Sequence, residues 1–137
     1  VTQPKNRPQT FLIAKAHATL QLLLNGWAVQ DVLFEGGPDL VAMRGREMVR
    51  VKTRYATKSD TGYVFSSGGR HKKTFFELSD SSDFLILVCI NANQPAGFYV
   101  FPHDRAPKAK AFLHSENGPF PKYKEFFGNW KPLQWKR

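Results

Sequence analysis

The sequence predicts an α/β fold with a mixed central sheet, and three features indicate it. After Thr10, a plausible helix N-cap, apolar residues recur at helical spacing until Asn25-Gly26, which is typical of a helix end. Two apolar runs flank Arg44-Gly45-Arg46-Glu47, which favours a β-hairpin with a four-residue loop. Phe84–Ile90 is uniformly apolar and has the length of a buried strand.

The remaining elements follow in order along the chain. The order helix, three strands, helix, two strands is typical of α/β or α+β sandwiches. We expect a leader over residues 1–9, a core over residues 10–102 and a basic aromatic extension over residues 103–137 that packs on the core. The expected elements are a strand at Trp27–Phe34, a turn at Gly36-Gly37-Pro38, hairpin strands at Leu40–Met43 and Met48–Thr53, a mobile loop at Tyr55–Arg70 with a possible short strand around Tyr63–Phe65, a helix at His71–Ser79, a turn at Asn91–Ala96, a strand at Gly97–Phe101 and a short helix at Lys122–Trp130.

The hairpin register predicts which side chains meet. If Met43 pairs with Met48, then Val41 pairs with Arg50 and Asp39 with Lys52. Paired residues share a face of the sheet, with Cβ atoms about 5 Å apart. Asp39, Arg50 and Lys52 are therefore expected on one face, while the core receives Leu40, Ala42, Val49 and Val51. A slip by one residue would break this cluster.

Composition bounds the function. The 137 residues carry 20 Lys and Arg against 11 Asp and Glu, a formal net charge of +9. Nine of the basic residues lie between Arg44 and Lys73, and eight lie between Asp104 and Arg137. Basic blocks of this kind favour a polyanion such as nucleic acid, because phosphate neutralisation releases counterions. A solvated basic surface is the alternative.

Other classes of protein are disfavoured. No apolar run approaches the ~20 residues of a membrane span, so no membrane partner is expected. The polar start shows no signal-peptide pattern. The single cysteine, Cys89, excludes an internal disulfide, and a reducing, cytoplasmic compartment is the plain inference.

Residues 36–54, GGPDLVAMRGREMVRVKTR, resemble the active-site hairpin of the PD-(D/E)XK nuclease superfamily, which includes restriction endonucleases, Holliday junction resolvases and intron homing endonucleases. Pro38-Asp39 starts one strand and Lys52 lies near the end of the next. The likeness extends over roughly residues 10–102. It implies a restriction endonuclease-like αβββαβ core, with a mixed sheet flanked by helices, and metal-dependent hydrolysis of DNA.

The resemblance also implies roles for individual residues. Asp39 would bind Mg²⁺ with help from the Val51 carbonyl, and Lys52 would act as the catalytic base or charge stabiliser. The family's second acid falls at Arg50, and the first-helix glutamate of resolvase-like members falls near Lys15. Both positions are cationic here. Glu35 and Glu77 are the favoured replacements, whereas Glu47 lies too far along the hairpin.

Three functions therefore remain open. The chain could be an endonuclease with an altered acid set, or a nuclease fold that only binds DNA or joins a complex. It could instead be a docking domain built on Phe120–Trp135, and a homodimer is possible. Asp39 could also simply stabilise a turn. The candidate DNA contacts are Lys15, Arg44, Arg46, Arg50, Arg54, Lys58, Arg70, Lys72 and Lys73.

Overall fold

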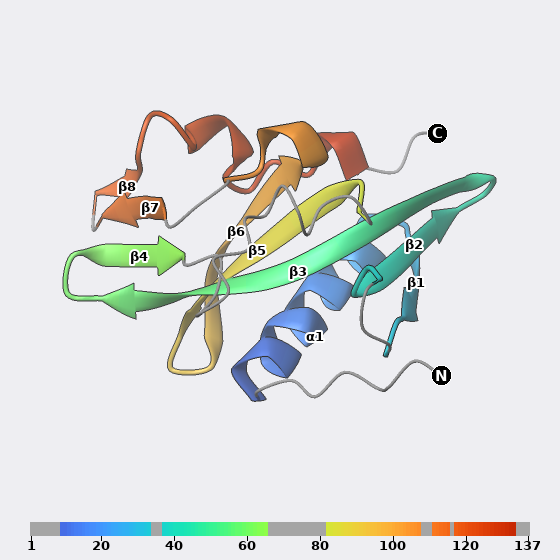
Figure 1. Ribbon diagram of the computed structural model, residues 1–137, viewed down its shortest axis with the longest axis horizontal. Coiled ribbons are helices and arrows are strands. Elements are labelled where there is room, and N and C mark those ends of the chain that lie inside the picture. Colours follow the sequence, from blue (N-terminus) through green and yellow to red (C-terminus); the bar gives the residue numbers. More distant parts are fainter. Residues whose placement is uncertain (1–8, 34–36, 66–81, 108–110, 116, 134–137) are drawn as a thin grey trace.

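The protein is an α/β sandwich in which one sheet organises the described residues (Figure 1). The computed structural model describes residues 9–33, 37–65, 82–107, 111–115 and 117–133. Its elements are α1 (Gln9–Leu24), β1 (Ala28–Asp31), β2 (Leu40–Arg44), β3 (Glu47–Ser59), β4 (Gly62–Phe65), β5 (Phe84–Asn91), β6 (Gln94–Pro102), β7 (Ala111–Ser115) and β8 (Gly118–Pro119), with 3-10 turns at His103–Arg105, Lys124–Phe126 and Lys131–Leu133. No described helix is long and apolar enough to span a membrane.

The thirteen-residue strand β3 is the axis of the sheet. Its first half pairs with β2 and its far end pairs with β4, both antiparallel. Along its other edge it pairs with β5 in parallel, and β5 pairs with β6. Strand β1 lies beside β2, and β7 lies beside β4. Figure 1 shows β3 running the length of the molecule, with hairpins at both ends.

Two apolar clusters cover the two faces of the sheet. One cluster packs the buried side of α1, including Ala14, Ala18 and Leu22, against Val51 and Ile86. Alternation along β3 and β5 sends the next side chains to the opposite face. That face holds a second cluster, in which Phe126 from the C-terminal segment joins strand residues; its other members are Ala56, Tyr63, Phe65, Leu85, Leu87, Cys89, Tyr99, Phe101 and Leu113.

The elements that the sequence predicts most clearly depend on residues close to one another in the chain. Helix α1 ends at a left-handed Gly26 (φ 89°), where the N–H of Trp27 donates to the carbonyl of Leu22. The hairpin pairs Met43 with Met48 and Val41 with Arg50, so the predicted register is confirmed. Its loop is shorter than expected, because Arg44 also pairs with Glu47 and only Gly45 and Arg46 turn the chain.

Several expectations are wrong. The loop expected over Tyr55–Arg70 is wrong for residues 55–61, since β3 continues to Ser59 and turns into β4, but β4 confirms the possible short strand around Tyr63–Phe65. The expected strand at Trp27–Phe34 is limited to Ala28–Asp31 among described residues. The helix expected over Lys122–Trp130 does not form; that part of the extension instead has 3-10 turns at Lys124–Phe126 and Lys131–Leu133. Strand β7, earlier in the extension, joins the sheet. The expected helix at His71–Ser79 lies outside the described residues.

Candidate functional site

The candidate site lies where the chain enters β2 beside the middle of β3. Strand pairing ends at Leu40 and Val51, but the N–H of Asp39 donates to the Val51 carbonyl at 2.9 Å, which keeps Asp39 against β3. The Asp39 carbonyl in turn accepts from the N–H of Val32, at 3.0 Å, after β1. The backbone thus holds Asp39 from both sides, at the end of the strand where the sequence placed it.

The Asp39 carboxylate is fully buried, and its contacts are polar. Its Oδ2 accepts from the Thr53 N–H at 2.7 Å and from Nη1 of Arg54 at 3.0 Å. Arg54 also donates to the Thr53 carbonyl and lies 5.9 Å from the centre of the Phe11 ring. Charge-assisted bonds of this kind satisfy a carboxylate that burial alone would penalise. Sequence reasoning put Arg54 among DNA contacts and missed its bond with Asp39.

Lys52 approaches the same junction from β3. Its side chain is 6% exposed, and Nζ donates to the carbonyl of Gly37, two residues before Asp39, at 2.8 Å. Leu40 and Val51 point to the α1 side of the sheet, so the alternating side chain of Lys52 faces the other way. The Asp39 carboxylate, the Lys52 ammonium and the Arg54 guanidinium therefore form one corner of the molecule. Two positive charges stand there against one negative charge.

Arg50, at the position where the resembled family has an acid, pairs with Asp83. Nη2 of Arg50 lies 3.2 Å from Oδ1 of Asp83, and the Arg50 N–H donates to Oδ2 at 2.8 Å. Burial pushes the pKa of Asp83 up, but its hydrogen bonds and charge pairing with Arg50 prevail and leave that pKa below its usual value. The same contacts raise the pKa of Arg50. Sequence reasoning missed Asp83, because its place beside Arg50 depends on the parallel pairing of β5 with β3.

Asp83 does not replace the missing acid beside Asp39. β2 and β5 lie on opposite sides of β3, with strand spacings of about 4.8 Å each, and Asp83 sits beside Arg50 rather than Lys52. Within the described ranges, no group of three or more His, Cys, Asp or Glu could hold a metal ion. The described residues by themselves therefore do not form a Mg²⁺ site at Asp39. Glu35 and Glu77 lie outside the described residues.

The other candidate DNA contacts separate into three groups. Lys15 is buried and its ammonium pairs with Asp31, while Arg44 is buried over the Trp27 ring, 4.1 Å from its centre, and pairs with Glu47. Both side chains are held inside the fold. Arg46 and Lys58 are exposed. Arg70, Lys72 and Lys73 lie outside the described residues.

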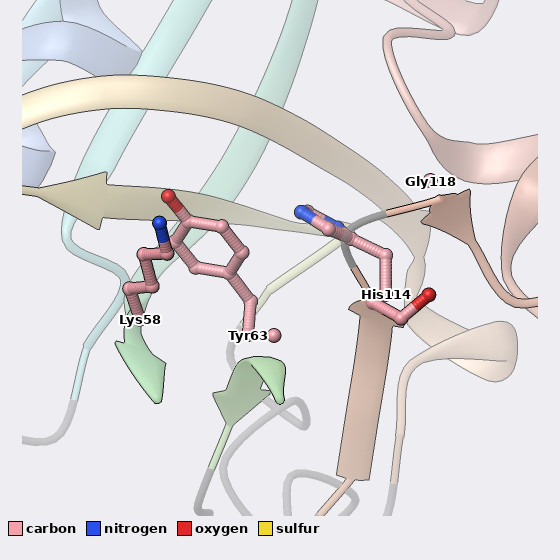
Figure 2. Close-up of a pocket in the computed structure, with 6 residues that line it drawn as sticks. Lys58, Tyr63, His114 and Gly118 are labelled. Atoms are coloured by element: carbon pink, nitrogen blue, oxygen red, sulfur yellow. The ribbon is translucent and has the colours of Figure 1, made fainter. Parts of the chain in front are cut away.

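Lys58 borders a cleft at the far end of β3. The cleft measures about 380 Å³ and is lined by Lys58, Gly62, Tyr63, His114, Ser115 and Gly118. Figure 2 shows the Tyr63 ring between Lys58 and His114. The Tyr63 and His114 rings lie 4.6 Å apart, and Nδ1 of His114 lies 2.9 Å from the hydroxyl of the buried Tyr99. Burial lowers the pKa of His114, so Lys58 supplies the positive charge of this cleft at neutral pH.

Comparisons with proteins of known structure identify the class of the fold. No protein-family model and no curated protein matches the chain. Among solved structures, a bacterial homing endonuclease is 21% identical with a TM-score of 0.66, and the match covers 90% of each chain. A Holliday junction resolvase from the archaeon Archaeoglobus fulgidus is 15% identical with a TM-score of 0.56, covering 94% of this chain and 100% of that one.

The chain therefore has the restriction endonuclease-like nuclease fold that the sequence predicted. At these identities the likeness establishes the fold. It does not by itself establish the reaction, the metal or the partner.

Proposed function

We propose that the protein acts on DNA and engages a phosphodiester at the corner formed by Asp39, Lys52 and Arg54. The observation that carries this proposal is the convergence of Lys52 and Asp39 at one junction of a nuclease fold. Exposed basic residues elsewhere on the chain, such as Arg46, add a non-specific attraction for phosphate. The proposal predicts duplex binding that weakens steeply as salt rises.

Hydrolysis is the first of two candidate activities. Its support is that Lys52 stands where a cation could offset charge building on a phosphate, next to a carboxylate. Because the described residues supply one carboxylate there, a divalent ion would need a second acid, and we propose Glu35 or Glu77 for that role. The expected product is a nicked or cut duplex formed only when Mg²⁺ or Mn²⁺ is added.

Binding without cleavage is the second candidate, and a different observation favours it. The Asp39 carboxylate is already paired with Arg54, and the family's acid position holds Arg50. An arginine offers several donors to a phosphate and cannot bind a metal ion. In this case the corner holds the DNA backbone through cations, and added metal changes nothing.

A nicking assay on supercoiled plasmid, run beside a duplex-binding titration, tests the proposal. The variants are Asp39→Asn, which keeps an acceptor for the Thr53 N–H, and Lys52→Met, which keeps the side-chain volume. Asp60→Asn, in the exposed turn after β3, is the matched control. Metal-dependent nicking lost in both site variants and kept in the control supports hydrolysis. Binding without nicking supports the second candidate, and absence of both overturns the proposal.

A further inference from the structure

The cleft at the far end of β3 takes its polar side chains from three strands that meet there. Lys58 comes from β3, Tyr63 from β4, and His114 and Ser115 from β7. Its volume of about 380 Å³ lies within the range of small-molecule sites, roughly 300 to 1,000 Å³. Among the described residues that line it, none is acidic. The cleft therefore differs from the Lys52 corner, where a carboxylate is present.

An irregularity in the pairing of β4 with β7 builds the wall of this cleft. Tyr63 pairs with His114 and Val64 with Phe112, so Leu113 is an extra residue on β7. Bulges of this kind redirect side chains and are frequent next to functional sites. Leu113 is buried in the second apolar cluster, and the Tyr63 and His114 rings lie 4.6 Å apart. The bulge thus places an imidazole opposite Tyr63, where regular pairing would have placed a leucine.

Hydrogen bonds orient the polar groups of this wall. Nδ1 of His114 lies 2.9 Å from the hydroxyl of the fully buried Tyr99. Nε2, on the other side of the ring, has no hydrogen-bond partner among the described residues. Ser115 Oγ accepts from the N–H of Asn117 at 3.2 Å, and its own proton can still be donated. One imidazole nitrogen and one hydroxyl thus remain for a ligand in the cleft.

Lys58 is an exposed cation that borders the cleft. Lys15, Arg44 and Arg50 each form an ion pair with an acid, whereas no carboxylate in the described part of the chain pairs with Lys58. An ammonium beside a cleft without acids favours an anion. Figure 2 shows the Tyr63 ring between Lys58 and His114, so this cation lies next to an aromatic wall.

We propose that the cleft binds an unpaired nucleotide of a nucleic-acid strand, with its phosphate on Lys58 and its base against the wall formed by Tyr63 and His114. Proteins that hold single strands combine cations for the backbone with aromatic side chains for the bases. They also bond the polar edge of an unpaired base, which Nε2 of His114 and the Ser115 hydroxyl can do here.

Other ligands would use only part of the cleft. Inorganic phosphate would contact the ammonium and leave the aromatic wall without a partner. A regular duplex keeps its bases paired and stacked, so only its backbone would approach Lys58. An uncharged small molecule would leave Lys58 without a counter-charge. An unpaired nucleotide engages the cation and the wall together.

The cleft lies where one nucleic acid can contact it and the Lys52 corner together. Lys52 and Lys58 are six residues apart on β3, so alternation sends both side chains to the same face. At about 3.3 Å per residue the two positions are about 20 Å apart. This spacing corresponds to about six steps of a duplex. The inference goes beyond the proposed function, because the cleft takes an unpaired nucleotide and the corner a phosphodiester of a duplex.

Fluorescence anisotropy with the full chain tests the inference on three DNA hairpins with the same duplex. One is blunt, one carries a short unpaired tail, and one carries a tail of equal length without bases. The variants are Lys58→Met and His114→Phe, which keeps a ring, removes both nitrogens and leaves Tyr99 its bond to the Leu113 carbonyl at 3.2 Å. Lys124→Met, at an exposed position of the C-terminal segment, is the matched control. Circular dichroism checks the folding of each variant.

We expect the wild type to bind the tailed hairpin about tenfold more tightly than the blunt one, and the tail without bases to lose most of this preference. Lys58→Met and His114→Phe should bring the ratio of the two dissociation constants close to one, whereas Lys124→Met should preserve it. A wild-type ratio near one overturns the inference. So does a tail without bases that binds as tightly as the complete tail, or a preference that survives both cleft variants.

The same titrations separate this inference from the proposed function. Lys52→Met should weaken binding of the blunt and the tailed hairpin by the same factor and leave their ratio unchanged. A chain that binds the tailed hairpin but not the blunt one supports the cleft and contradicts the duplex contact at Lys52.

Discussion

The middle and the far end of β3 hold polar side chains in different ways. In the middle, Lys52 and Asp39 are buried and bonded to backbone groups of neighbouring segments. At the far end, Lys58 is exposed and borders an open cleft with Tyr63 and His114. The first region fixes its charged groups by hydrogen bonds to the backbone and by an ion pair, and the second positions its polar groups by ring packing and one side-chain hydrogen bond, between His114 and Tyr99. Substitutions in the middle should therefore reduce stability through lost hydrogen bonds and charge pairing, and substitutions at the far end through backbone clashes and altered burial of the cleft residues.

The largest expected effect is loss of the buried carboxylate. Asp39→Ala leaves the Thr53 N–H without its acceptor and Arg54 without its counter-charge, so we expect the free energy of unfolding to fall by about 3 to 5 kcal/mol. Urea unfolding measures it. Asp60→Ala, in the exposed turn after β3, should change the same quantity by less than about 0.5 kcal/mol. Equal effects of the two variants would contradict a bonded, buried Asp39.

At the far end of β3, the backbones of β4 and β7 approach each other closely at Gly62. A Cβ at Gly62 would lie 1.9 Å from the carbonyl oxygen of His114, and the backbone there is left-handed (φ 139°). Gly62→Ala should therefore separate β4 from β7 and lower the midpoint of thermal unfolding. Gly118→Ala has a left-handed φ of 104° but no atom within 4 Å, so it isolates the cost of backbone strain, about 1 to 3 kcal/mol. We expect the Gly62 variant to be the more destabilised; the reverse order would contradict the pairing.

The ion pair beside the middle of β3 should matter less than Asp39. Arg50 and Asp83 are both about two-fifths exposed, so solvent screens them and Arg50→Met should lower the free energy of unfolding only slightly, by much less than Asp39→Ala does. Because the folded-state pKa of Asp83 is lowered, its contribution is complete above the unfolded pKa and is lost as pH falls through the folded value. Unfolding measured at neutral and acidic pH should thus show a smaller difference between wild type and variant in acid. A difference that grows in acid would contradict this pairing.

The smallest effect concerns the cleft histidine. Burial lowers the pKa of His114, so the unfolded chain takes up a proton first as pH falls below about 6.5. Stability should therefore decline with acidification through this range, and the decline should weaken in His114→Gln. Thermal unfolding between neutral and mildly acidic pH measures the difference. Ser115→Ala, which lines the same cleft but removes no ionisable group, is the control and should keep the wild-type slope. If stability declines with acidification as steeply in His114→Gln as in the wild type, the His114 ring is solvated in the folded protein and the prediction is wrong.

The same contrast explains how far the sequence could predict the structure. The β2–β3 hairpin and its register depend on neighbours in the chain, so alternation and one turn were enough to bring Asp39 and Lys52 together. The parallel pairing of β5 with β3 joins residues more than thirty positions apart. The position of Asp83 beside Arg50 depends on this pairing, so the sequence alone did not indicate it. The cleft likewise depends on β7 meeting β4, which no local pattern of residues 55–65 indicated.

The site was predicted only in part for a related reason. Burial of Asp39 makes a nearby cation favourable, but the sequence offers Arg50, Lys52 and Arg54 on alternating positions of one strand. Which of them bonds Asp39 depends on where β2 begins relative to β3. The residue that bonds Asp39 is Arg54, and only the folded structure shows this.

A crystal structure of the chain with a short DNA duplex tests the central claim most directly. If the corner engages DNA, a phosphate oxygen lies within hydrogen-bond distance of Nζ of Lys52, with Arg54 or Arg50 on the same phosphate or its neighbour. A duplex seated elsewhere, such as on the C-terminal segment after His103, with Lys52 still donating to the Gly37 carbonyl, would contradict it.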